Sequence, residues 1–207
     1  MKAILVHQFQ PTEDLREHVA GLAVIPRRAL SLPTIQGAAA VGVAAGAPAI
    51  AAFVELLGTH KALRAAIATW PAPVSAWLVD EHLPADAPRS WPAGGLSPGV
   101  RLVSSVYRKA GLDRSNFSHH WRTLHTEIAM SYTVPVWRYS QNVVVEVLRP
   151  DEGEDGFAVL HFRTAEDLAA RWSRYPEEAR RGAEDAALFM DPRRGWSVAM
   201  TETVWEE

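Results

Sequence analysis

The pattern of hydrophobic and polar positions predicts a helix, a turn and a strand over residues 111–142. Asp113 is a suitable N-cap, because its carboxylate can accept hydrogen bonds from the free N–H groups of a first helical turn. Large side chains then recur at helical spacing and form one stripe, made by Phe117, Trp121, Leu124, His125 and Ile128. The following strand alternates between two faces, one with Trp137, Tyr139, Gln141 and Val143 and the other with Arg138, Ser140 and Asn142.

Three histidines lie on this helix, and the pattern turns one of them toward the interior. At about 100° per residue, His119 and His120 point away from the apolar stripe, whereas His125 lies on it. Because the unperturbed pKa of histidine is about 6.5, an imidazole can give or take a proton near neutral pH. His125 is therefore the candidate catalytic residue. The alternative is a structural role, in which the ring of a core histidine bonds a backbone carbonyl.

Further residues are candidates to surround this histidine and bind a substrate. Polar side chains on the strand can orient a carbonyl or hydroxyl, although packing between elements explains them as well. Residues on neighbouring strands join the pocket only if they share its face. The candidates are Phe117 and Trp121 as apolar walls, Tyr139, Gln141 and Asn142 as polar groups, and Tyr107 and His161 on neighbouring strands.

The two halves of the chain show the same expected order of elements. In the first half, strands are expected at 3–9, 34–44, 49–57 and 73–83, and helices at 12–29 and 59–70. In the second half, strands are expected at 100–108, 136–148, 157–163 and 195–205, and helices at 113–132 and 164–189. Each half reads as βαββαβ, the order of a ferredoxin-like unit. The stretch 86–99 is rich in Pro and Gly, which indicates a linker between a diverged repeat at 1–85 and a second repeat at 100–207.

This order predicts the fold class. Each expected sheet carries helices on one face, so its other face needs a cover. The simplest cover is the sheet of the other half. We therefore predict an α+β fold in which two ferredoxin-like βαββαβ repeats pack sheet to sheet as a pseudo-dimeric α+β barrel. The alternative is a homodimer, in which a second chain covers the sheets of two separated domains.

The composition of the 207 residues excludes several kinds of site. A net charge of −3 gives no electrostatic reason to expect a nucleic-acid partner. The absence of cysteine excludes disulfides, thiolate zinc sites and a cysteine nucleophile. No GxGxxG, P-loop or HExxH pattern is present, so neither a nucleotide cofactor nor a metal site is expected. The first residues lack the apolar core of a secretory signal, which favours a cytoplasmic protein.

One uncharged segment, residues 37–54, reaches the length of a membrane span. It consists mostly of Ala and Gly, and the run Gly46-Ala47-Pro48 interrupts it. Two buried strands joined by a tight turn are the better interpretation, so no membrane partner is expected.

Several short motifs recur in a fixed order over about residues 100–206. They are Phe117-x-x-x-Trp121-x-x-x-His125, Arg138-Tyr139-x-Gln141-Asn142, Gly156-Phe157, and Leu188-Phe189-Met190-Asp191-Pro192. Together they resemble the EthD-like family of the dimeric α+β barrel superfamily. The resemblance implies cofactor-free chemistry on small, often aromatic or polyketide-derived molecules, such as decarboxylation, cyclisation, dehydration or isomerisation. Other members are accessory proteins of degradation pathways.

The chain departs from the family pattern at two positions. The pattern tends to place a histidine after the Gln-Asn pair, where this chain has Val143. It often places an acid near Val159, which is also apolar here. In the first half, Ala23 takes the place equivalent to His125. We therefore expect the first half to be a structural partner and the second half to hold the site.

The leading hypothesis is a cofactor-independent enzyme that acts on a small aromatic or polyketide-like molecule with His125 as general acid/base. The alternative is a non-catalytic small-molecule-binding or accessory protein of a catabolic or biosynthetic pathway, which the apolar residues at 143 and 159 favour. A third hypothesis, haem binding, would need an axial histidine on an open cavity.

Overall fold

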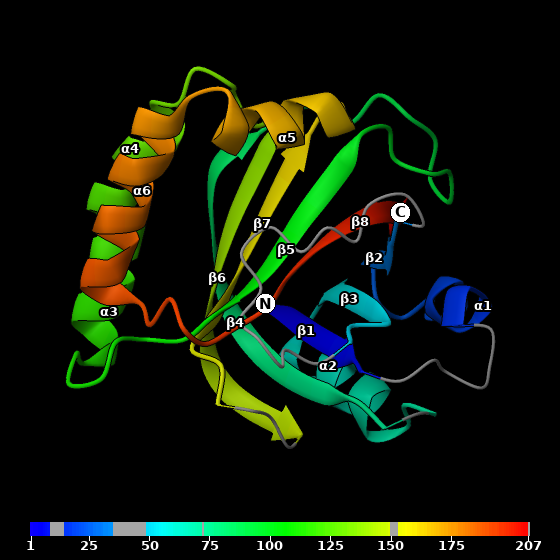
Figure 1. The fold of residues 1–207 in the computed structure, drawn as a ribbon. Helices are drawn as coiled ribbons and strands as arrows, with labels where there is room; N and C mark the ends of the chain where they lie inside the picture. Colours follow the sequence, from blue (N-terminus) through cyan, green and yellow to red (C-terminus); the bar gives the residue numbers. More distant parts are fainter. Residues whose placement is uncertain (9–14, 35–48, 72, 150–152, 207) are drawn as a thin grey trace.

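The computed structural model describes residues 1–8, 15–34, 49–71, 73–149 and 153–206 (Figure 1). The strands of these residues are β1 Lys2–His7, β2 Arg27–Pro33, β3 Ala52–Leu57, β4 Ser75–Asp86, β5 Val100–Val106, β6 Arg138–Arg149, β7 Gly156–Phe162 and β8 Ser197–Glu206. The helices are α1 Leu15–Ala20, α2 His60–Ala68, α3 Arg114–His120, the π-helical turn η1 Trp121–His125, α4 Thr126–Met130, α5 Ala165–Ser173 and α6 Pro176–Phe189.

All eight of these strands close into one antiparallel barrel, in the order β1-β3-β2-β8-β5-β7-β6-β4. Two pairings join the halves of the chain, β2 with β8 and β4 with β6. An open sheet leaves unpaired backbone N–H and C=O groups on its edge strands. These two pairings form hydrogen bonds with groups that two separate sheets would leave exposed. The prediction of two ferredoxin-like α+β repeats packed sheet to sheet is therefore wrong. The described residues form a single closed, mostly β barrel.

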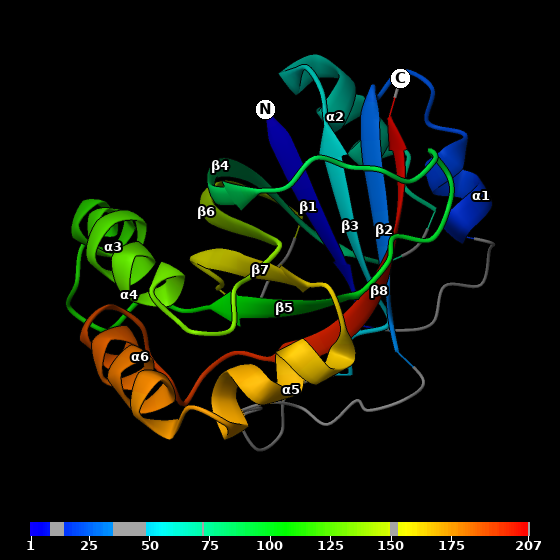
Figure 2. The same cartoon turned by 90° about the horizontal axis from the view of Figure 1, so that it is seen from above.

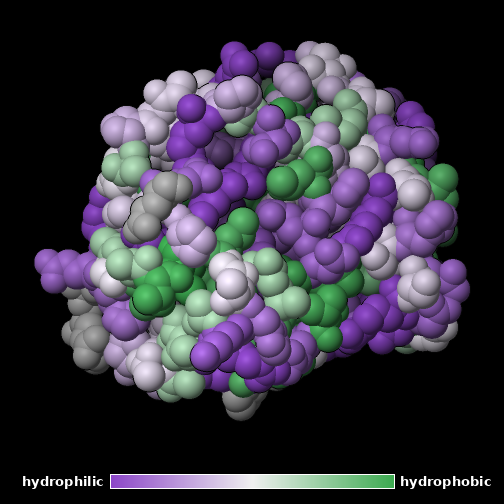
Figure 3. Space-filling view, turned by 180° about the vertical axis from the view of Figure 1, so that it is seen from behind, coloured by the Kyte–Doolittle hydropathy of each residue, from purple (hydrophilic) through white to green (hydrophobic). Residues whose placement is uncertain are grey.

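Helices cover the outside of the barrel on two opposite sides (Figures 1 and 2). Helices α1 and α2 pack on β1, β2 and β3, whereas α3, α4, α5 and α6 lie outside β5, β6 and β7. On the face shown in Figure 3, hydrophobic and hydrophilic side chains are interspersed. Among the described residues, no helix combines the length and apolar character that a membrane crossing requires.

The first half differs from its predicted elements. A helix was expected at 12–29, but α1 ends at Ala20 and the strand β2 begins at Arg27. Two residues of this connection disfavour helix: Gly21 directly follows α1, and Pro26 has no N–H to donate and disfavours helical geometry in the residue before it. The strand expected at 34–44 lies outside the described residues except for Thr34, as does most of the uncharged segment 37–54.

The barrel interior has an apolar part and a charged part. Alternate residues of each strand point inward. The charged part lies where β1 begins: Lys2 Nζ is 2.7 Å from carboxylate oxygens of both Glu55 and Glu81, and Arg101 pairs with Glu55 and Glu202. Because buried charges are stable only when paired, these contacts tie five strands together. The apolar part is formed by Ile4, Val6, Phe53, Trp77, Val103, Val144, Phe157, Val159, Trp196 and Met200, with Ile50 and Val79.

Candidate functional site

The helix predicted over residues 113–132 is present as three consecutive segments, α3, η1 and α4, of which the middle one is a wider turn. Asp113 caps it, since its Oδ1 accepts a hydrogen bond from the N–H of Asn116 at 2.8 Å. The middle turn, η1, has π-helical i→i+5 spacing, a geometry that often marks functional sites. The carbonyl of Trp121 accepts hydrogen bonds from Thr126 Oγ1 and Gln141 Nε2, both at 3.0 Å. The side chain of a barrel strand therefore supports the irregular turn.

The face of this helix that points to the barrel meets a buried polar network. Trp121 Nε1 donates to the hydroxyl of Tyr139 at 3.2 Å, and Gln141 Nε2 donates to the same hydroxyl at 2.9 Å. Burial raises the pKa of Tyr139, so its hydroxyl stays protonated at neutral pH. Gln141 Oε1 is buried without a hydrogen-bond partner among the described residues. The structure thus brings together the predicted residues Trp121, Tyr139 and Gln141.

A second face of the helix meets α6 through two histidines and one carboxylate. His125 Nδ1 lies 2.8 Å from one oxygen of Asp185, and His120 Nε2 lies 3.0 Å from the other. The side chains of His125 and Asp185 are 18% and 11% exposed. His120, which was expected in solvent, is therefore partly buried and paired. Asp185 was not identified from the sequence, because it lies in a run of charged residues on α6 that resembles an ordinary solvated helix face.

The environment of His125 favours its neutral form. Burial lowers its pKa below the ordinary value of 6.5, although the hydrogen bond and charge of Asp185 act in the opposite direction. With Nδ1 directed at the carboxylate, Nε2 is the remaining ring nitrogen, and no described residue forms a hydrogen bond with it. A neutral imidazole that is oriented by a carboxylate can accept a proton at its other nitrogen.

Aromatic side chains pack around this pair. The ring of Phe189, one helical turn after Asp185 on α6, lies 5.0 Å from the ring centroids of both His120 and His125. Phe189 also contacts Phe117 at 5.9 Å, and Phe117 is fully buried. The predicted apolar walls Phe117 and Trp121 therefore fill the space between the helices and the barrel.

The other predicted residues lie away from His125. Asn142 faces the barrel interior, where its Nδ2 donates to the carbonyl of Phe157 at 3.1 Å and its Oδ1 has no partner among the described residues. His161 also belongs to the interior, with Nε2 2.8 Å from the carbonyl oxygen of Pro98, and burial lowers its pKa. Tyr107 follows β5, and the guanidinium of Arg194 lies over its ring at 3.9 Å.

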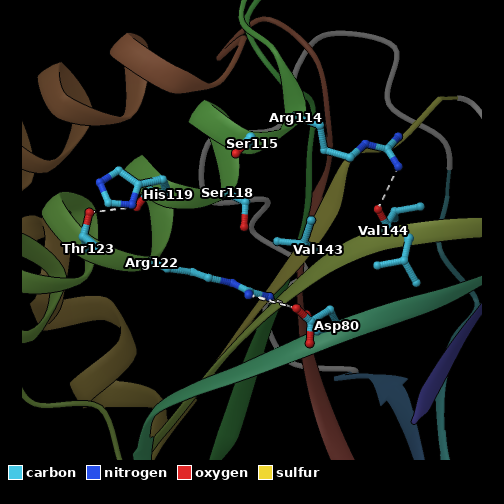
Figure 4. Close-up of a pocket in the computed structure, with 10 residues that line it drawn as sticks. Asp80, Arg114, Ser115, Ser118, His119, Arg122, Thr123, Val143 and Val144 are labelled. Atoms are coloured by element: carbon cyan, nitrogen blue, oxygen red, sulfur yellow. Dashed lines mark hydrogen bonds and ion pairs between the residues drawn. The ribbon is translucent and has the colours of Figure 1, made fainter.

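A third face of the helix lines an open cleft of about 710 Å³ (Figure 4). Ligand pockets span roughly 300–1,000 Å³, so the cleft has the size of a small-molecule site. None of the predicted site residues lines the cleft. Val143 does line it, at the position where the family pattern tends to have a histidine. Among the described residues, no group of three or more His, Asp and Glu side chains is placed to hold a metal ion. The lining residues are Val143, Val144, Val145, Asp80, Arg114, Ser115, Ser118, His119, Arg122 and Thr123.

Neither the family models nor the curated proteins that were compared match this chain. Solved structures do. A "putative monooxygenase" from Lactobacillus acidophilus NCFM aligns with a TM-score of 0.55 and 9% identity, over 99% of this chain and 95% of that one. An anthrone oxidase-like protein aligns with a TM-score of 0.67 and 8% identity, over 98% of this chain and 91% of that one.

At these identities the likeness shows the fold alone. Both neighbours share this fold over nearly the whole of their chains, and the dimeric α+β barrel superfamily stays a prediction. The EthD-like family itself stays a prediction.

Proposed function

We propose that the protein is a cofactor-independent enzyme that acts on a small aromatic or polyketide-like molecule, with His125 as general acid/base. The single observation that carries the proposal is the contact of 2.8 Å between His125 Nδ1 and Asp185. It orients the imidazole and leaves Nε2 for a substrate proton. Proton transfer is the step that decarboxylation, cyclisation, dehydration and isomerisation share.

In this proposal, Asp185 and His125 act as one unit. The neutral ring takes a proton from a carbon or hydroxyl of the substrate at Nε2, and the carboxylate stabilises the imidazolium that forms. The same nitrogen then returns the proton to another atom of the substrate. The lowered pKa of His125 supports the first step, because the ring is mostly unprotonated at neutral pH.

Proton exchange on a weak carbon acid tests the proposal without knowledge of the later steps. The anthrone oxidase-like neighbour suggests anthrone as the first compound. We expect the protein to accelerate exchange of the benzylic C–H of anthrone in D2O, followed by proton NMR, and His125→Ala to slow it by about 10²- to 10⁴-fold. Asp185→Asn should slow it and change its pH profile. His60→Ala, an exposed histidine on α2 that does not line the cleft, is the control.

Exchange as fast in His125→Ala as in the parent protein would contradict the assignment. A panel of aromatic and polyketide-like carbon acids replaces anthrone if the parent protein does not act on it. Protein-dependent exchange on no member of the panel would favour the second candidate.

The second candidate is a non-catalytic small-molecule-binding or accessory protein of a catabolic or biosynthetic pathway. Three observations favour it. The cleft does not include His125, and its floor has Val143 where the resemblance leads us to expect a histidine. The barrel interior likewise has Val159 where an acid is often found. Binding without any proton exchange would distinguish this candidate from the enzyme.

A further inference from the structure

The cleft beside α3 and η1 combines an apolar floor with a polar wall. Val143 and Val145 project from β6 toward its outer face, since inward and outward positions alternate along a strand. Val143 is buried, whereas Val145 is 49% exposed. The opposite wall is one stripe of the helix, with hydroxyls at Ser115 and Ser118 and a guanidinium at Arg122. A flat apolar molecule could cover the valines while a polar group contacts the helix.

Arg122 crosses the cleft from η1 to β4 (Figure 4). Its Nη1 donates to Asp80 Oδ2 and its Nη2 to the backbone carbonyl of Asp80, both at 2.9 Å. Its Nε is buried and has no hydrogen-bond partner in the described part of the chain. Because most buried donors are paired in folded proteins, this unpaired Nε–H leaves the guanidinium able to take a further acceptor when Asp80 is displaced.

The charges of the cleft favour an anion as that acceptor. Arg114 and Arg122 lie on either side of Val143 in Figure 4, and Asp80 is the one carboxylate among the residues that line the cleft. Arg114 donates one bond, from Nη1 to the carbonyl of Val144 at 3.1 Å, which leaves its charge uncompensated by any carboxylate of the lining. The two guanidinium groups of the lining thus outnumber its carboxylate by one.

We infer that the cleft binds a small, flat, apolar acid, whose anionic group pairs with Arg122 in competition with Asp80. The apolar body covers Val143 and Val145, and the positive charge of Arg114 adds to the attraction. This inference rests on the small-molecule part of the proposed function and not on catalysis by His125. It also assigns a role to Asp80, whose carboxylate bonds Arg122 and therefore weakens the binding of an acid.

Two fluorescent probes with nearly the same rings test the charge requirement. The anion is 1-anilinonaphthalene-8-sulfonate, and its neutral counterpart is N-phenyl-1-naphthylamine. We expect Arg122→Gln to weaken the binding of the anion by about three- to tenfold, and Arg114→Gln by a smaller factor. Asp80→Asn should strengthen it by about two- to fivefold, because it frees the guanidinium and removes a like charge. The neutral probe should bind all three variants as it binds the parent protein.

The two substitutions are expected to change the affinity for the anion in opposite directions, stronger in Asp80→Asn and weaker in Arg122→Gln. A loss of structure would instead weaken the binding of both probes. Arg180→Gln, an exposed arginine on α6 that pairs with Glu177 and Glu184, is the matched control and should change neither. Any of three results would overturn the inference. The first is a parallel change in the affinities of both probes, and the second is anion binding by Arg122→Gln that is as strong as in the parent protein. The third is the absence of saturable anion binding by the parent protein. His125→Ala should bind the anion normally, so failure of the proposed catalysis and failure of this inference are distinguishable.

Discussion

The buried charges at the end of the barrel where β1 begins lead us to expect a large effect of a single substitution on stability. Arg101 is 4% exposed and contacts carboxylates from two strands, Glu55 on β3 and Glu202 on β8, as well as the hydroxyl of Ser31 on β2. Arg101→Met keeps much of the length and the apolar stem of the side chain and removes the charge. Both carboxylates, 8% and 7% exposed, then lose a cation.

Removal of one partner from a buried ion pair costs about 3–5 kcal/mol, because the remaining charge is buried without compensation. Lys2 offsets little of this cost, since it already contacts both Glu55 and Glu81. For a protein of this length, each kcal/mol shifts Tm by about 2–4 °C, so Tm should fall by about 6–20 °C. Burial raises the pKa of Glu55 and the charge of Arg101 opposes this, so in Arg101→Met acidification should protonate Glu55 and reduce the deficit.

The assay is denaturant unfolding of Arg101→Met at pH 7 and pH 5, compared with Arg64→Met. Arg64 pairs with Glu146 on the surface, where the two side chains are 46% and 41% exposed, so this control should lose no more than about 1 kcal/mol. The combination of Arg101→Met with Glu202→Gln should recover part of the loss. If Arg101→Met lost no more stability than Arg64→Met, the end of the barrel would be hydrated and the reasoning from buried charge would be refuted.

Two further predictions concern packing and pH. A Cβ at Gly156 would lie 2.6 Å from Trp121 Cζ3 and 2.8 Å from the carbonyl oxygen of Asn142. Gly156→Ala should therefore lower the free energy of unfolding by about 1–3 kcal/mol in denaturant titrations. The control is Gly111→Ala, whose Cβ meets no atom within 4 Å and which should show only the strain of its positive φ. His7 accepts a hydrogen bond from Trp70 Nε1 at 3.1 Å, and burial lowers the pKa of His7 to about 4. The contribution of His7 to stability is therefore complete above pH 6.5 and is lost as the pH falls toward 4. His7→Gln should reduce this pH dependence of the free energy of unfolding, and an unchanged pH profile in this variant would contradict the prediction.

The local elements of the second half could be predicted, because their signals are local. Asp113 caps the helix that was expected to begin there, and Phe117 and Trp121 are buried on its inner stripe. Along β6, Tyr139 and Gln141 face the helices while Asn142 faces the barrel interior, as the two-residue alternation of a strand requires. Capping and alternation depend on neighbours a few residues away, which a sequence displays directly.

The closure of the barrel could not be predicted in the same way. It depends on the pairing of β2 with β8, in which Arg27 lies opposite Glu206, and of β4 with β6. These partners are far apart along the chain, and no local pattern distinguishes a strand at the edge of a sheet from one that continues into the next. The charged cluster of Lys2, Glu55 and Arg101 has the same origin, since its members meet only after closure.

The partners of His125 depend on a departure from regular helical geometry. In an α-helix, side chains five residues apart diverge by about 140°, which is why His120 was expected to point into solvent. The π-helical turn η1 removes most of this divergence, so that His120 and His125 reach the two oxygens of Asp185. The support for this turn comes from Gln141 on another element, which donates to the carbonyl of Trp121.

A pair of histidines five residues apart on a predicted helix is therefore worth testing as a joint site whenever a strand nearby offers an amide to hold a π-turn. The same turn sets the direction of Arg122, so the proposed acid/base pair and the proposed anion site depend on one irregularity of the backbone.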